Sequence, residues 1–213
     1  MDKSWNNIYA AGFQLNEYPY EWVIASTKKI INNPNKKNVL DLGCGNGNHI
    51  NFFLKFKFKF ITAIDASEVV IKSVFKKFRH NKKIEIINDN ISTHNFRVNF
   101  YDLILDRMTI THNKKKEIKV LVNNLYTSLK KDGYIFSMCF SQKHNEYKKL
   151  NKNGISFNNI YKTKGITTSF MSLNDIKDIY KKFKIISIVE EIKNDVLTGD
   201  SQAFWYLILK KND

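Results

Sequence analysis

Short apolar runs alternate with longer amphipathic segments along most of the chain. Ile84–Asn88 is typical of a strand, whereas the apolar residues of Ser67–His80 recur at helical spacing. The pattern predicts strands over 39–42, 61–64, 84–88, 101–105, 134–140, 184–192 and 202–210, and helices over 21–31, 67–80 and 115–130. This alternation predicts an α/β protein whose ligand site lies at the carboxyl ends of its strands.

Two stretches are rich in aromatic residues. The N-terminal stretch, Trp5 to Lys29, predicts a short helix, a loop through Pro19 and a second helix from Glu21. This stretch either covers one edge of the sheet or forms a lid over a cofactor. Tyr9 and Tyr20 are the residues expected to face inward. In residues 55–60 phenylalanines alternate with lysines, which predicts a half-buried approach to a strand. Such interleaving also occurs in proteins that bind single strands of nucleic acid, but core packing is favoured because the run leads directly into an apolar strand.

At 213 residues, the chain is expected to form one domain. We divide it into an N-terminal helical lid (1–36), a cofactor-binding core (37–140), a substrate-side insertion (141–171) and a closing helix with two strands (172–213). No run approaches the roughly 18 apolar residues of a membrane span, and the first residues lack the apolar centre of a secretory signal. The sequence therefore predicts a cytoplasmic protein.

Charge and cysteine content narrow the possible chemistry. Cys44 and Cys139 lack metal-ligand spacing, so reduced, packed thiols are expected and no metal site is predicted. The net charge is +15, yet only three of the 35 basic residues are arginine. Dedicated phosphate recognition generally uses more of the bidentate guanidinium group, so we interpret most of the charge as solvated surface. An anionic small substrate and a nucleic acid both remain open.

The central motif is a glycine-rich turn at the end of the first predicted strand. Asp41 is followed by Gly43, Gly45 and Gly47, and then by a segment compatible with a helix. A phosphate loop would need Lys-Ser or Lys-Thr after the glycines, which this chain lacks. A dinucleotide fingerprint is disfavoured by Asn48, where a small residue is expected.

Acidic residues mark the ends of the next three strands. Asp65 ends the second strand, about 20 residues after the glycine turn, where a carboxylate can accept from both ribose hydroxyls. Asp89 and Asp106 follow the third and fourth strands. The alternative role of Asp65 is a helix cap, and that of Asp89 is a turn formed by the Asx pair Asp89-Asn90, which is compatible with ligand binding.

Together, the D-x-G-x-G-x-G turn and the three acidic strand ends resemble class I S-adenosylmethionine-dependent methyltransferases, over roughly residues 36–140. This resemblance implies a Rossmann-like, doubly wound, seven-stranded sheet, mostly parallel with an antiparallel last strand. It also implies that Asp89 accepts from the adenine amino group. The residues expected to bind the cofactor are Tyr9, Asp41, Gly43, Cys44, Gly45, Asn46, Asp65, Ala66, Asp89, Asn90, Ile91 and Asp106.

A finer resemblance involves Trp5–Tyr9, Tyr18–Tyr20, the Asp106–His112 turn and residues 137–144. These segments are similar to small methyltransferases found among bacterial capsule and lipopolysaccharide genes. The resemblance implies O-methylation of a small acceptor, such as a sugar nucleotide or a phosphorylated metabolite, for surface polysaccharides.

Methyl transfer requires that acceptor, methyl carbon and sulfur lie in line, and a base is optional. His112 is the predicted base for an alcohol acceptor, Asp106 lies beside it, and Arg107 would position an anionic acceptor. Tyr20, His144 and the glycine-punctuated segment Asn153–Phe170 are predicted to contact the substrate. Two alternatives stay open: a nucleic-acid methyltransferase, which the charge favours, and a nicotinamide-dependent oxidoreductase, which only the shared fold favours.

Overall fold

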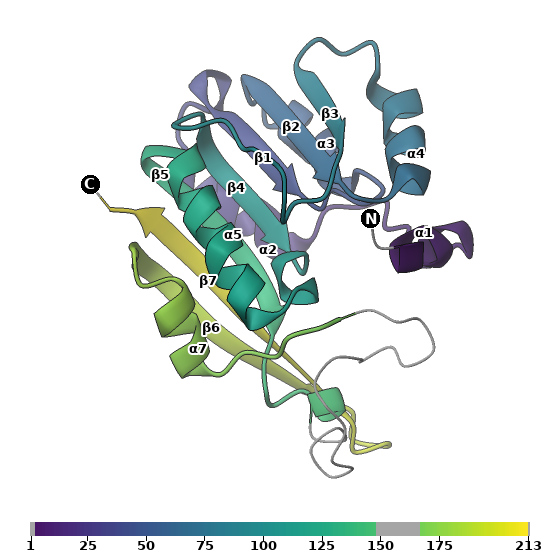
Figure 1. The fold of residues 1–213 in the computed structure, drawn as a ribbon, viewed down its shortest axis with the longest axis vertical. Coiled ribbons are helices and arrows are strands. Elements are labelled where there is room, and N and C mark those ends of the chain that lie inside the picture. The colour runs from purple at the N-terminus through teal and green to yellow at the C-terminus, as the bar shows by residue number, and fades with distance from the viewer. Residues whose placement is uncertain (1–2, 148–166, 213) are drawn as a thin grey trace.

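A computed structural model describes residues 3–147 and 167–212, in which seven strands form one sheet (Figure 1). The strand order is β3-β2-β1-β4-β5-β7-β6. The strands are β1 (Asn38–Leu42), β2 (Phe60–Asp65), β3 (Ile84–Asn88), β4 (Tyr101–Arg107), β5 (Leu129–Phe140), β6 (Phe183–Asn194) and β7 (Ser201–Lys211). Strands β1 to β5 pair in parallel, and β7 runs antiparallel to both β5 and β6. The predicted fold class is confirmed.

Helices cover both faces of the sheet. On one face, apolar residues of α2 and α3 pack against β1, β2, β4 and β5, and α4 packs beside α3. On the other face lie α5 and α7, nearer the viewer in Figure 1. The helices are α1 (Lys3–Ala10), α2 (Glu21–Ile30), α3 (Asn48–Lys55), α4 (Glu68–Phe78), α5 (Lys115–Ser128) and α7 (Leu173–Ile179), with short 3₁₀ turns η1 (Pro34–Lys36) and η2 (Ile110–His112).

The alternating stretch at 55–60 is not an approach strand as predicted. Lys55 ends α3, Lys57 adopts a left-handed conformation with φ of 68°, and β2 begins only at Phe60. Phe58 is nevertheless completely buried among residues of α2 and α3. The prediction of core packing is therefore confirmed, whereas the prediction of an extended backbone is wrong because the helix and a tight turn bury the same ring.

Strand β5 begins five residues earlier than predicted. Residues 130–133 are polar and end in glycine, which suggested a turn. In the structure Lys130 Nζ lies 2.8 Å from Asp102 Oδ2, and Lys210 Nζ lies 2.6 Å from Asp132 Oδ1. Pairing with β4 is interrupted between Leu129 and Tyr134, and Asp132 has φ of 62°, so these residues form a bulge within β5 that the two ion pairs tie to neighbouring strands.

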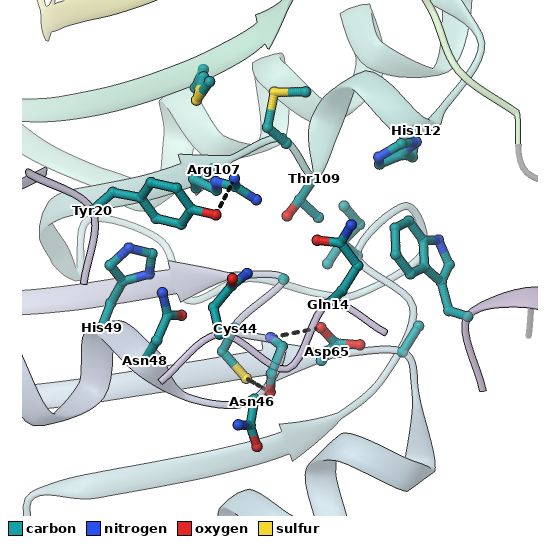
Figure 2. A pocket seen from close by; sticks show the side chains of 18 of the residues that line it. Gln14, Tyr20, Cys44, Asn46, Asn48, His49, Asp65, Arg107, Thr109 and His112 are labelled. Atoms are coloured by element: carbon teal, nitrogen blue, oxygen red, sulfur yellow. Dashed lines mark hydrogen bonds between the residues drawn. The ribbon is translucent and has the colours of Figure 1, made fainter. Parts of the chain in front are cut away.

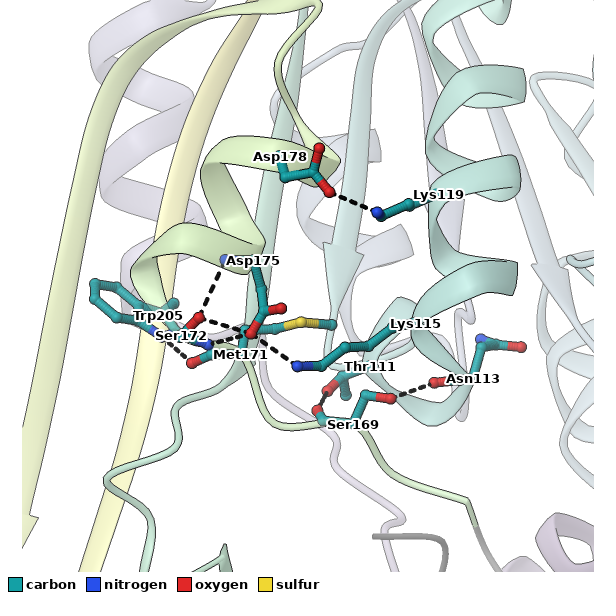
Figure 3. Close-up of polar contacts among 10 residues, drawn as sticks. All are labelled: Thr111, Asn113, Lys115, Lys119, Ser169, Met171, Ser172, Asp175, Asp178 and Trp205. Carbon is teal, nitrogen blue, oxygen red and sulfur yellow. Dashed lines mark hydrogen bonds and ion pairs between the residues drawn. The ribbon is translucent and has the colours of Figure 1, made fainter.

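The segment Thr167–Ser172 runs along the carboxyl edge of the sheet into α7 (Figure 3). Ser169 and Thr111 are joined twice, because Ser169 N donates to Thr111 O at 2.8 Å and Thr111 Oγ1 donates to Ser169 O at 2.6 Å. Ser172 Oγ accepts from Asp175 N in a capping box at the start of α7. The substrate segment proposed from sequence, 153–170, lies outside the described residues except for its last four.

None of the described helices is long and apolar enough to cross a membrane.

Candidate active site

A pocket of about 520 Å³ opens at the carboxyl ends of the parallel strands. Its walls come from the turns after β1, β2 and β4, from the ends of β5 and β7, and from the N-terminal segment that includes α1 (Figure 2). This is the edge at which open α/β sheets bind their ligands.

The glycine turn forms the floor of the pocket and has no space for side chains. Gly43, Gly45 and Gly47 have φ values of 68°, 50° and 78°, a region that favours glycine. A Cβ on Gly43 would lie 2.1 Å from Thr109 Oγ1, and one on Gly45 would lie 3.2 Å from the Tyr9 hydroxyl. The turn therefore brings bare backbone to the pocket surface.

Asp65 lies beside this turn at the end of β2. Its Oδ2 accepts from Gly45 N and its Oδ1 accepts from Ser67 N, both at 2.9 Å. Burial raises the pKa of Asp65, while these backbone N–H groups favour the ionised form. Each carboxylate oxygen has a second lone pair, so Asp65 can also accept from ligand hydroxyls.

Aromatic and apolar side chains flank Asp65. Trp5 and Tyr9 of α1 pack against each other with ring centroids 5.8 Å apart, and burial raises the pKa of Tyr9. All three side chains line the pocket. The other residues expected from sequence that line it are Gly43, Cys44, Gly45, Asn46, Ala66, Asn90 and Ile91.

Three of the expected acidic residues do not line this pocket. Asp41 is buried beneath the glycine turn, only 2% exposed. The side chain of Asp89 is 46% exposed and bonds to Asn90 N at 2.7 Å and to His94 Nδ1 at 2.8 Å. The Asx turn is formed by the neighbouring Asn90, whose Oδ1 accepts from Ser92 N at 3.0 Å.

Asp106 points into the protein rather than into the pocket. Its Oδ1 accepts from Thr109 N and Ile110 N at 2.9 and 3.0 Å, and its Oδ2 accepts from Ser137 Oγ at 2.6 Å. Burial raises the pKa of this carboxyl group to about 6. The fully buried side chain holds the turn after β4 in place, so its part in the site is to position other residues.

The wall opposite Asp65 carries a cation. The Arg107 guanidinium lies 3.8 Å from the centroid of the Tyr20 ring and donates to the Tyr20 hydroxyl. Both residues line the pocket. Among the described residues that line it, Asp65 and Arg107 are the charged ones with histidine neutral, so a carboxylate and a guanidinium lie on separate walls (Figure 2).

The two predicted histidines lie at the β5 side of the pocket. His112 contacts the Trp5 ring edge-on at 4.9 Å, and its Nδ1 lies 3.0 Å from Thr168 Oγ1. His144 packs on Phe140 and Phe204 at 5.2 and 5.7 Å between ring centroids. The structure therefore brings His112, His144, Arg107 and Tyr20 to one pocket.

Several lining residues escaped the sequence analysis. His49 follows the glycine turn, Thr109 follows Arg107, and Gln14 comes from the loop after α1. Met138 and Phe204 lie on adjacent strands, β5 and β7. Proximity to motifs could have indicated His49 and Thr109, whereas Gln14 and Phe204 carry no sequence signal because only the tertiary fold brings them here.

Comparisons with known proteins agree with this geometry. Residues 39–133 match the family model described as a methyltransferase domain. A search of curated proteins found no significant match.

Many solved structures share the fold. A S-adenosylmethionine-dependent methyltransferase from Anabaena variabilis is 17% identical, with a TM-score of 0.71 over 99% of this chain and 93% of that one. A S-adenosylmethionine-dependent methyltransferase from Methanosarcina mazei is 16% identical, with a TM-score of 0.70 over 91% of this chain and 98% of that one. The 1,6-didemethyltoxoflavin-N1-methyltransferase of Burkholderia thailandensis is 14% identical, with a TM-score of 0.72 over 100% of this chain and 87% of that one. That structure contains bound 1,6-didemethyltoxoflavin and S-adenosylhomocysteine.

The matched domain spans the glycine turn, Asp65 and the turn after β4, which form the floor of the pocket and two of its walls. Residues 39–133 therefore carry a methyltransferase domain, and the chain has the fold of class I methyltransferases, a class whose cofactor is S-adenosylmethionine. The residues present fit this cofactor, since Asp65 offers acceptors for ribose hydroxyls and the bare glycine turn permits close approach of a ligand. When bound, the cofactor supplies an electrophilic methyl group on a sulfonium.

Proposed function

We propose that the protein methylates an oxygen atom of a small anionic acceptor. The observation that carries this proposal is the separation of charge in the pocket, with Asp65 on the wall expected to hold the cofactor and Arg107 on the opposite wall. A guanidinium group fixed by an aromatic ring recognises phosphate or carboxylate oxygens well. The small-molecule substrate bound to the Burkholderia thailandensis neighbour supports an acceptor of this size.

The side chains divide into two sets in this proposal. Asp65 accepts from the ribose hydroxyls, and Ala66 and Ile91 make apolar contacts with the adenine ring. Arg107 and Tyr20 hold the acceptor, and His144 with its aromatic neighbours closes the β5 side of the pocket. The Trp5–Tyr9 pair excludes water from the pocket.

We propose His112 as the group that takes the proton of an alcohol acceptor. It lines the pocket between Trp5 and Phe140, where it can reach a bound acceptor from the β5 side. An acceptor that is already ionised would not require it. Asp106 supports the reaction indirectly by holding the turn that carries Thr109.

The similarity of the N-terminal aromatic segments to methyltransferases of capsule and lipopolysaccharide genes extends the proposal to sugar nucleotides for surface polysaccharides. A screen of sugar nucleotides and phosphorylated metabolites, with S-adenosylmethionine and mass spectrometry, tests it. The expected result is a mass gain of one methyl group on an anionic compound and none on its neutral analogue. Methylation of RNA alone, with salt-dependent binding, would contradict the proposal and favour the nucleic-acid alternative.

Binding of S-adenosylhomocysteine can be tested separately by thermal shift. We expect S-adenosylhomocysteine to raise the melting temperature, because a ligand that binds only the native state stabilises it, and NAD to leave it unchanged. Stabilisation by NAD instead would favour an oxidoreductase.

A further inference from the structure

His49 is a buried histidine on the wall that also carries Arg107. It is the second residue of α3, is 3% exposed and lines the pocket. Its ring packs beside Tyr20 at 5.9 Å and Phe53 at 6.4 Å between centroids. Figure 2 shows His49 next to Tyr20, on the side of the pocket away from His112.

The polar atoms of this ring lack the partners that a buried histidine usually has. Nε2 has no hydrogen-bond partner among the described residues, and Nδ1 lies 3.8 Å from Asp41 Oδ1, too far for a hydrogen bond. An unsatisfied buried nitrogen costs free energy that a phenylalanine of similar shape would avoid. An imidazole at this position is therefore explained better by a ligand than by packing.

The surroundings of His49 determine its charge. Burial and the nearby Arg107 guanidinium lower its pKa to about 3, so the ring is neutral near pH 7. Asp41 Oδ1 lies 3.8 Å from Nδ1, so the ionised form of Asp41 favours the tautomer with its proton on Nδ1. In that tautomer Nε2 carries a lone pair and accepts hydrogen bonds.

Arg107 supplies the complementary chemistry a short distance away. Its guanidinium is held against the Tyr20 ring at 3.8 Å and donates to the Tyr20 hydroxyl. One wall of the pocket therefore presents N–H donors with a positive charge and, beside them, a neutral acceptor.

We propose that His49 and Arg107 together recognise the methyl acceptor, with Arg107 binding an oxyanion and His49 Nε2 accepting from a neighbouring hydroxyl group. This inference rests on the proposed function and narrows it to acceptors with a phosphate or carboxylate close to a free hydroxyl, as in sugar phosphates and uronic acids. His49 is a binding and orienting residue here, because a base must have a pKa closer to the working pH. The amino-acid end of the cofactor, a carboxylate beside an ammonium group, offers similar chemistry.

Binding measurements distinguish these two sources. Affinities for glucose 1-phosphate, glucuronate and neutral glucose would be measured with saturating S-adenosylhomocysteine, and the affinity for S-adenosylhomocysteine would be measured alone. The wild type is expected to bind both anions and to bind glucose at least about tenfold more weakly. In His49→Phe, affinity for the anions should fall at least about tenfold, with the affinity for S-adenosylhomocysteine within about twofold and the melting temperature unchanged or higher.

Two further variants complete the test. His49→Gln places an amide near the position of Nε2 and should restore most of the anion binding, whereas Arg107→Gln should abolish the preference for anions over glucose. ¹⁵N NMR of the histidine rings should show a neutral His49 with its proton on Nδ1.

Each other outcome has a defined meaning. Unchanged anion binding in His49→Phe, no anion binding in the wild type, or a proton on Nε2 would overturn the inference and leave the proposed function intact. Weaker binding of S-adenosylhomocysteine in His49→Phe would assign this wall to the cofactor and also overturn it. Failure of the wild type to bind S-adenosylhomocysteine would instead refute the proposed function.

Discussion

The close approach of the glycine turn to the turn after β4 leads to a quantitative prediction for Gly43→Ala. An added Cβ would lie 2.1 Å from Thr109 Oγ1, 2.4 Å from Cγ2 and 2.7 Å from Cβ. Rotation of the threonine side chain cannot relieve the last contact, so the backbone must move. That backbone is held by Thr109 N, which donates to Asp106 Oδ1 at 2.9 Å.

Gly199→Ala is a matched control for this variant. Gly199 has φ of 69°, against 68° for Gly43, and nothing lies within 4 Å of its added Cβ. Both variants incur the left-handed backbone cost of roughly 1–2 kcal/mol. Only Gly43→Ala adds overpacking, which costs about 1–3 kcal/mol more.

Urea unfolding of both variants measures the difference. We expect the free energy of unfolding of Gly43→Ala to fall about 1–3 kcal/mol further than that of Gly199→Ala. Its affinity for S-adenosylhomocysteine should fall too, because both Gly43 and Thr109 line the pocket. In the background of Thr109→Gly most of the extra loss should disappear. Equal losses for the two alanine variants would refute the steric argument.

Two other carboxylates give predictions with different readouts. Asp65→Asn should weaken S-adenosylhomocysteine binding at least about tenfold by calorimetry, because its amide group would face a backbone N–H. Asp89→Asn changes an exposed side chain outside the pocket lining and should have a much smaller effect. Similar losses of affinity in the two variants would disprove the different placement of these two carboxylates. Burial and then Asp65 raise the pKa of Asp41 to about 7, so the folded state retains a proton between about pH 4 and 7 that the unfolded state releases. The free energy of unfolding of the wild type should therefore fall, relative to that of Asp41→Asn, as the pH rises through this range. Urea unfolding at several pH values measures this change, and a constant difference between the two proteins would contradict the prediction.

The sheet was predictable because its strands are continuous apolar runs. Ile84–Asn88 matches β3 residue for residue, and the parallel order followed from the family resemblance. The predicted strand boundaries were less accurate where ion pairs or turns, rather than the local hydrophobic pattern, determine where a strand begins. Residues 130–133 were assigned to a turn, and Asp132 does adopt a left-handed conformation. The local pattern could not show that this turn is a bulge within β5, because the ion-pair partners Asp102 and Lys210 are distant in sequence.

Pocket residues that belong to a sequence motif could be predicted, whereas the orientation of side chains that depends on tertiary contacts could not. Asp65 and Asp106 have the same chemistry and the same position at a strand end, yet one faces the pocket and the other caps the turn that follows it. That orientation depends on Ser137, three strands away from Asp65 in the sheet, and no local pattern encodes it. His49 resembled an ordinary helix residue because its buried, partnerless nitrogen is visible only in three dimensions.

The two ends of the pocket belong to different halves of the sheet. The turns after β1 and β2 build one end, whereas the tips of β5 and β7 supply Met138, Phe140 and Phe204 at the other. Strand β4, with Arg107, lies between them. Under the proposed function, substitutions at the tips of β5 and β7 are expected to alter the choice of acceptor while the residues proposed to bind the cofactor stay the same, which would make this scaffold suitable for directed evolution toward new methylated products.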